Sequence, residues 1–104
     1  MEGLSIGPIL EFLERDDLDS LVGFLQCDRV DINEVDEDGW SALFHSVSKN
    51  NVNFVDCLLE NGADPNICDN SNRTPLHEAV GEDNKTIAAL LIEAGADVEA
   101  KAGK

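Results

Sequence analysis

Apolar residues recur along this chain with spacings of three and four, which is the pattern of an amphipathic helix. They predict helices in pairs, because each short apolar stretch is followed by a break and then by a second stretch. The first stretches hold Ile9, Leu10 and Leu13; Leu43, Phe44 and Val47; and Leu76, Ala79 and Val80. The second stretches hold Leu18, Leu21, Val22 and Leu25; Val52, Val55, Leu58 and Leu59; and Ile87, Leu90 and Leu91.

The three predicted pairs follow one another because the sequence repeats itself at an offset of 33 residues. Two copies match most clearly, and a further step back reaches a weaker one. The matching positions are Ser41 and Thr74, Leu43 and Leu76, Gly62-Ala63-Asp64 and Gly95-Ala96-Asp97, Leu10 and Leu43, Leu21-Val22 and Phe54-Val55, and Asp31-Ile32-Asn33 and Asp64-Pro65-Asn66. We therefore predict three repeats, at about residues 3–35, 36–68 and 69–101, of which the first is irregular and cap-like.

Residues with turn and capping preferences separate the predicted helices. Thr74 is suited to the N-cap position, and Pro75 to the first helical position, where its missing N–H costs nothing. Asn and Asp adopt a left-handed turn more readily than other non-glycine residues. We expect such a turn between the helices of each pair, at Asp17, Asn50 and Asp83. Between repeats, tight hairpin turns are predicted at Asp38-Gly39 and Ser71-Asn72.

The hexapeptide Thr74-Pro75-Leu76-His77-Glu78-Ala79 matches T-P-L-H-x-A, which together with a 33-residue period is the signature of the ankyrin repeat. The chain therefore resembles the ankyrin-repeat family over residues 3–101. This resemblance implies an all-α solenoid of stacked helix-turn-helix units joined by β-hairpin loops, as a single array over residues 1–104. It also implies that His77 hydrogen-bonds to the backbone of its own or an adjoining loop. In the second repeat Phe44 takes that position, which leaves His45 for another role.

The end of the chain leaves the array open. One repeat cannot bury its apolar face alone, so stacked neighbours must share a continuous core. A fourth repeat would begin its hairpin at Ala102-Gly103-Lys104, and no closing helix follows to cover Leu90 and Leu91. Either the array continues in a longer protein, which we prefer, or another surface covers this face. We expect a monomer.

Composition and charge narrow the range of partners. With 42% apolar residues in 104, the chain has the composition of a folded array rather than a disordered tail. It carries 22 acidic residues against seven basic ones, a formal net charge of −15. Such a field repels nucleic acids and anionic membranes and attracts basic protein segments. The alternative is that the acidic surface only keeps the array in solution.

Candidate chemistry is sparse. Cys27, Cys57 and Cys68 show no C-x-x-C spacing, and no positively charged leader or membrane-length apolar run is present. We therefore expect a reducing compartment, the cytoplasm or the nucleus, with Cys57 in the core. A zinc site of Cys57, Cys68 and His77 lacks ligand spacing. Without a nucleophile motif, a phosphate-binding loop or a carboxylate pair in a pocket, we expect no enzyme, no metal and no cofactor.

The resemblance instead implies a binding surface, since ankyrin arrays generally bind proteins along a concave face made by hairpin tips and the exposed sides of the first helices. The positions that match this face are Glu37, Asp38 and Trp40, then His45, Ser48 and Lys49, then Asn70, Ser71 and Arg73, and finally Glu78 and Glu82. Trp40 is the strongest candidate, because exposed aromatic residues often anchor interfaces. Alternatively, Trp40 packs down on its hairpin and on the helix of the first repeat.

Three functions are compatible with this reading. We predict a non-catalytic interaction module whose acidic concave face binds a basic peptide or protein surface. The first alternative is a small ankyrin-type inhibitor or regulator of an enzyme such as a protein kinase. The second is a structural spacer within a longer solenoid.

Overall fold

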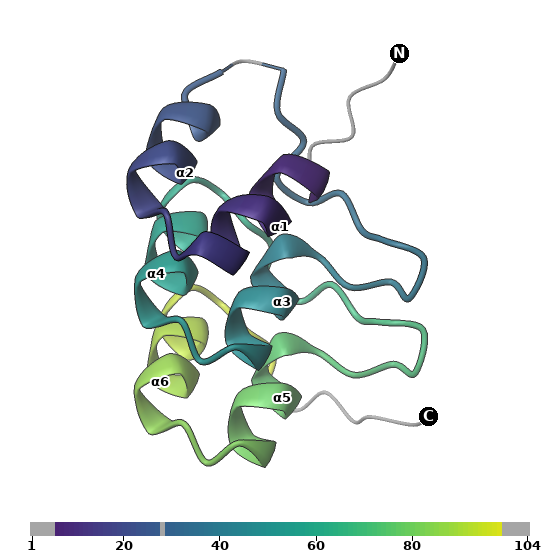
Figure 1. Ribbon diagram of the computed structural model, residues 1–104. Coiled ribbons are helices and arrows are strands. Elements are labelled where there is room, and N and C mark those ends of the chain that lie inside the picture. Colours follow the sequence, from purple (N-terminus) through teal and green to yellow (C-terminus); the bar gives the residue numbers. More distant parts are fainter. Residues whose placement is uncertain (1–5, 28, 99–104) are drawn as a thin grey trace.

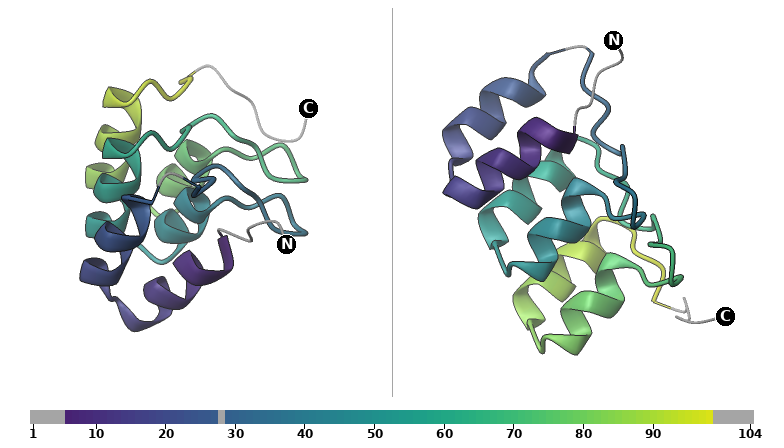
Figure 2. Two further views of the ribbon diagram at one scale, coloured as in Figure 1. Left: turned by 90° about the horizontal axis from the view of Figure 1, so that it is seen from above. Right: turned by 45° about the vertical axis from the view of Figure 1, so that its right-hand side comes forward.

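The computed structural model describes residues 6–27 and 29–98. Three helix pairs stack in chain order in this part of the chain (Figure 1). The helices are α1 (Ile6–Arg15), α2 (Leu18–Leu25), α3 (Ala42–Ser48), α4 (Val52–Glu60), α5 (Pro75–Gly81) and α6 (Lys85–Glu93). The first helix of each pair lies beside the connecting loops and the second lies away from them (Figures 1 and 2). The predicted all-α solenoid is confirmed, and the expected start of a fourth repeat at residues 102–104 falls outside the described residues.

Side-chain caps begin the helices where the sequence predicts them. Thr74 Oγ1 accepts a hydrogen bond from the backbone N–H of His77, and Pro75 is the first residue of α5. Ser41 caps α3 in the same way, its Oγ accepting from the N–H of Phe44 at 3.1 Å. Each cap satisfies one of the backbone donors that a helix leaves unpaired at its N-terminus.

The left-handed turns inside the pairs agree with the prediction in two repeats of three. Asn50 and Asp83 both have φ of 58°. In the first repeat the residue with positive φ is Asp16, at 54°, so the prediction of Asp17 is wrong. Asp17 is instead the N-cap of α2, where its carboxylate accepts from the hydroxyl and the backbone N–H of Ser20. These two hydrogen bonds lower the pKa of Asp17.

A one-residue difference in repeat length explains the error. The N-caps Asp17 and Asn51 are 34 residues apart, whereas Asn51 and Asn84 are 33 apart. The first repeat therefore holds one more residue than the others between its second N-cap and the loop that follows. Counted from the caps, Leu21 corresponds to Val55, and the predicted match of Leu21 with Phe54 is wrong by one position.

The core is continuous through the three repeats. It is made by buried residues of all six helices, among them Ile9, Leu13, Leu21, Leu43, Val47, Phe54, Val55, Leu58, Leu76, Ala79, Ile87 and Leu91. Extensive contacts join α1 to α3 and α3 to α5, and likewise α2 to α4 and α4 to α6. The rings of Phe12 and Phe24 pack edge to face, with their centroids 5.6 Å apart, and join α1 to α2. Every repeat is thus stabilised mainly by burial against its neighbour.

An asparagine in each loop links one repeat to the next. Asn33 Oδ1 accepts from the backbone N–H of Asp64 at 2.8 Å, and Asn66 Oδ1 accepts from that of Asp97 at 2.7 Å. Both bonds therefore connect equivalent positions of successive repeats.

In the described residues no helix is both long enough and apolar enough to cross a membrane.

Candidate protein-binding surface

Two hairpins project from the same side of the stack (Figures 1 and 2). The first hairpin (residues 36–40) is closed by hydrogen bonds from Asp36 N to Trp40 O and from Gly39 N to Asp36 O, both 3.0 Å. The second hairpin (residues 69–73) has the equivalent pair, from Asp69 N to Arg73 O and from Asn72 N to Asp69 O. The predicted hairpin turns are confirmed, although Val35 and Ser41 form only an isolated β-bridge and the described residues contain no strand.

One carboxylate organises each hairpin from within. Asp36 Oδ1 accepts from the backbone N–H groups of Asp38 and Trp40 at 2.9 and 3.0 Å. Asp69 Oδ1 accepts from those of Ser71 and Arg73 at 2.8 and 2.9 Å. Sequence reasoning did not include these two residues in the site. Their recurrence at the same repeat position, one residue after an apolar stretch, was the available signal.

The second oxygen of Asp36 binds His45. The imidazole Nε2 donates to Asp36 Oδ2 at 2.8 Å, and both side chains are about a quarter exposed. Burial acts to raise the pKa of Asp36, but the hydrogen bonds from His45 and from the Trp40 and Asp38 backbone outweigh it, so the pKa lies below its ordinary value. His45 therefore ties helix α3 to the first hairpin.

Trp40 is half-buried and joins the two hairpins. Its indole N–H donates to Asp69 Oδ2 at 3.2 Å. Its ring packs against Phe44 and His45, with centroids 4.5 and 4.9 Å apart. The structure thus favours packing over full exposure. This hydrogen bond and these ring contacts are made with α3 and the second hairpin, whereas the expected packing was on the hairpin and the helix of the first repeat.

The two hairpin tips also contact each other directly. Asn70 donates from its backbone N–H to Asp38 O at 3.0 Å and from Nδ2 to Glu37 O at 2.9 Å. Gly39 makes room for this approach, since a Cβ there would lie 2.6 Å from Asn70 Oδ1 and 2.9 Å from Asn70 N. The two hairpins therefore form a single hydrogen-bonded edge.

Arg73 and Glu78 satisfy each other in the third repeat. The guanidinium forms an ion pair with the Glu78 carboxylate and lies 5.7 Å from the centre of the Phe44 ring. Glu78 is almost buried, with 11% of its side chain exposed. By repeat position this pair replaces Trp40 and His45, so a tilted aromatic pair and an ion pair occupy equivalent places. Neither Arg73 nor Glu78 presents an isolated charge.

The remaining predicted residues lie at the hairpin tips and at the C-terminal ends of α3 and α5. Lys49 is exposed and pairs with Glu14 at 3.5 Å, a surface contact of small energy. Ser48 ends α3 half-buried, while Glu82, Asn70 and Ser71 are exposed. Glu37 and Asp38, which we call the acidic tip, are exposed too. Among the residues that the structure describes, neither carboxylate has a hydrogen-bond or ion-pair partner.

The side chains of His77 and Cys57 interact with residues of their own repeats. His77 Nδ1 accepts from the backbone N–H of Thr74 at 3.0 Å, which confirms the predicted role of this histidine within its own turn. Cys57 is half-buried, and burial, followed by the charges of Glu60 and Asp56, raises its pKa. No group of three His, Cys, Asp or Glu side chains within residues 6–27 and 29–98 could hold a metal ion.

Comparison with known proteins identifies the family to which this stack of capped helix pairs belongs. A family model described as ankyrin repeats in three copies matches residues 12–102. The chain belongs to the ankyrin-repeat family. Ankyrin repeats are protein-interaction modules, so other proteins are the partners of this array.

Individual ankyrin-repeat relatives differ widely in length. The chain is 32% identical over 91 residues to protein phosphatase 1 regulatory subunit 27 of Mus musculus, covering 88% of this chain and 59% of that protein. It is 37% identical over 73 residues to BCL-6 corepressor-like protein 1 of Homo sapiens, covering 70% of this chain and 4% of that protein. It is 37% identical over 78 residues to NAD-capped RNA hydrolase NUDT12 of Homo sapiens, covering 75% and 17%. The chain thus spans less than two thirds of each of these relatives.

Proposed function

We propose that this ankyrin array is a non-catalytic binding module whose hairpin edge receives a basic segment of another protein. The acidic tip carries the proposal, because Glu37 and Asp38 are exposed and have no partner within the described residues. A net charge of −15 adds a long-range attraction for cations and disfavours nucleic acid and anionic membranes.

The internal contacts of the hairpins support this role by fixing the backbone beneath the tip. Trp40 and Asn70 bond the first hairpin to the second, and Asp36 holds the turn from inside. A surface that is already ordered loses less conformational entropy when it binds. We therefore assign Trp40 a positioning role and the acidic tip the direct contact with the partner.

The expected affinity contribution of the tip is modest. Exposed ion pairs contribute about 0.2–1 kcal/mol each, so two of them contribute at most about 2 kcal/mol. Salt screens such exposed charges, since the Debye length is about 8 Å at physiological ionic strength. Binding should consequently weaken as salt is raised.

Paired variants with the same charge change test this proposal. The tip variant combines Glu37→Gln with Asp38→Asn. The control combines Asp56→Asn with Glu60→Gln, which removes two exposed carboxylates of α4 on the side away from the loops. Binding to an immobilised array of basic peptides, and capture of partners from cell extract, would be compared at low and high salt.

The proposal expects the tip variant to lose binding and the control to keep it. Equal weakening of both variants would show that only the overall charge matters. Unchanged binding by the tip variant would exclude this surface.

A second candidate function is regulation of an enzyme. It is supported by the similarity to a phosphatase regulatory subunit, which covers 88% of this chain. In this case the partner captured by the array would be a catalytic subunit. The test is to add the purified chain to that enzyme and to measure its rate. A rate that stays constant at saturating chain would exclude regulation and leave simple binding.

A further inference from the structure

The outer side of the third repeat exposes apolar residues whose counterparts in the second repeat are buried. Val80 is 65% exposed, whereas Val47, one repeat earlier, is fully buried. Val98 is 61% exposed, whereas the equivalent Pro65 is buried. The third repeat covers the second, and within the described residues nothing covers the third. We call the surface of Val80, Ala88 and Val98 the open face.

The residues that lie uncovered on the third repeat differ from those expected from the sequence. Leu91, which we expected to lie uncovered, is fully buried, and Leu90 is half-buried. The exposed positions are instead the ones that face the next repeat in the stack. Three of the five large apolar residues that are exposed in the described chain, Val80, Ile92 and Val98, belong to the third repeat.

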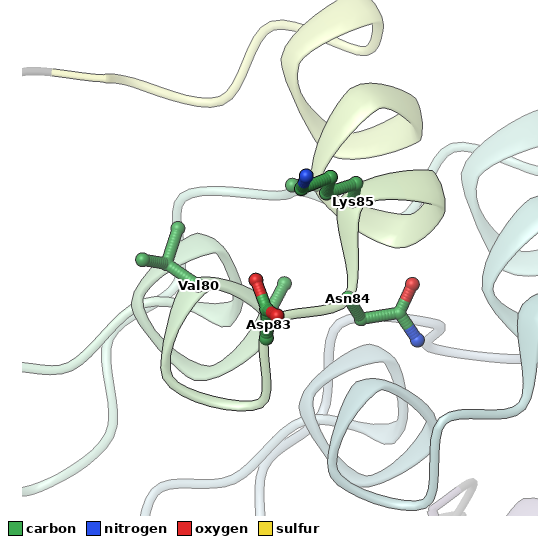
Figure 3. A pocket seen from close by; sticks show the side chains of 6 residues that line it. Val80, Asp83, Asn84 and Lys85 are labelled. Atoms are coloured by element: carbon green, nitrogen blue, oxygen red, sulfur yellow. The ribbon is translucent and has the colours of Figure 1, made fainter.

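A shallow pocket of about 150 Å³ lies on the open face between α5 and α6 (Figure 3). It is lined by Ala79, Val80, Asp83, Asn84, Lys85 and Ala88. Asp83 and Lys85, of opposite charge, flank its apolar floor. Neither forms an ion pair in the described part of the chain, so both charges remain for an incoming surface.

The turn residues form a ladder that ends at this pocket. Asn51 Nδ2 donates to Asp16 Oδ1 at 2.9 Å, and Asn84 Nδ2 donates to Asn50 Oδ1 at 3.0 Å. Asp83 is the next turn residue of the series, and it is exposed. Its carboxylate is therefore placed to accept from whatever packs on the open face.

We propose that the open face binds a second copy of this chain in a twofold symmetric dimer. A twofold axis brings the same patch of both copies together, so the charges on the patch must complement themselves. Asp83 and Lys85 meet this requirement, because an axis that passes midway between them brings Asp83 of one copy opposite Lys85 of the other. Val80 and Ala88 then cover each other, as Val47 and Val55 are covered in the stack.

The distribution of charge favours this arrangement over head-to-tail stacking. Residues 69–104 hold seven acidic and four basic residues, a net −3, while residues 1–35 hold nine and two, a net −7. Two copies repel each other least when they meet through their third repeats. A head-to-tail contact would bring the most acidic repeat onto the open face. This proposal departs from the monomer and from the continued array that we expected from sequence, and it does not depend on the proposed function.

Sedimentation equilibrium at protein concentrations from about 10 µM to about 1 mM, a range suited to a weak dimer, measures the self-association. Val80→Asp is compared with Val22→Asp, which changes another exposed helical valine, on α2 in the first repeat. Burial of one valine changes an equilibrium constant by roughly one to two powers of ten. The dimer should therefore weaken at least about tenfold in Val80→Asp and stay unchanged in Val22→Asp. Circular dichroism confirms that both variants fold.

Two variants with altered charge test how the two copies are oriented in the dimer. Lys85→Glu places a second carboxylate opposite Asp83 and should weaken the dimer. Adding Asp83→Asn to the same chain removes that repulsion and should recover part of the association, since Asn tolerates the positive φ of this position. A monomer throughout the concentration range, a loss caused by Val22→Asp, or no effect of Val80→Asp would overturn the proposal.

Discussion

Gly39 gives the sharpest test of whether the two hairpins act as one edge. We consider Gly39→Ala beside Gly62→Ala, because both glycines have positive φ, at 80° and 97°. A Cβ at Gly62 would meet nothing within 4 Å. A Cβ at Gly39 would lie 2.6 Å from Asn70 Oδ1, 2.9 Å from Asn70 N and 3.1 Å from Asp69 Cα. The pair therefore separates the backbone cost from the clash.

The two contributions have different sizes. A left-handed backbone costs a non-glycine residue about 1–2 kcal/mol, and both variants lose this amount. The Asn70 side chain can swing away, but only by giving up its bond to Glu37 O. The Asn70 nitrogen and the Asp69 Cα belong to the backbone, so the second hairpin itself must shift. Overpacking of this kind costs about 1–3 kcal/mol more. We expect Gly62→Ala to lose about 1–2 kcal/mol and Gly39→Ala about 2–5 kcal/mol.

Urea denaturation followed by circular dichroism gives the free energy of unfolding of both variants by linear extrapolation. Fluorescence of Trp40, the single tryptophan, reports in the same experiment on the region between the hairpins. In Gly39→Ala the emission of the folded protein should change, because the indole bonds to Asp69 of the displaced hairpin. Equal losses in the two variants, with unchanged folded-state emission, would refute the account of one joined edge.

Three further outcomes follow from burial, capping and pH. Phe54→Ala should lower the free energy of unfolding by about 3–5 kcal/mol, since Phe54 is fully buried, and urea denaturation measures this loss. Thr74→Ala should cost about 1 kcal/mol by the same measurement, through the lost cap of α5. The folded-state pKa of Asp36 is lowered, so its contribution to stability is present above its ordinary value of 3.8 and is lost as pH falls through the folded value. The urea midpoint of the wild type should fall as the pH drops below 3.8, and Asp36→Asn should make this fall less steep. An equally steep fall in the variant would exclude Asp36 as the source of the pH dependence.

The helices and most turns could be predicted because each rests on a local preference. Asn50 and Asp83 show this, since a positive φ favours Asn and Asp whatever lies around them. Asp17 was misassigned because a fixed offset cannot reveal one additional residue. Leu21 and Val22 are both apolar, as are Phe54 and Val55, so a shift of one position still pairs apolar residues. Burial separates them, since Leu21 is fully buried and Val22 is 41% exposed.

The hairpin edge was predictable as a region but not as a set of contacts. The hairpin tips were found because their position in the repeat is regular. Bonds such as Trp40 Nε1 to Asp69 Oδ2 join residues 29 apart and leave no periodic trace in the sequence. Sequence reasoning therefore preferred an exposed anchor at Trp40 and kept packing as the alternative, whereas its hydrogen bond and ring contacts are made inside the chain.

The pattern of helix contacts also has a consequence for how the chain folds. The extensive contacts join α1 to α3 and α3 to α5, so only the second repeat touches both others along its length. Any partly folded form that buries an interface between repeats must therefore include α3 or α4 of the second repeat. Amide hydrogens of these two helices should exchange with solvent more slowly than those of the outer helices, while either end of the chain opens independently.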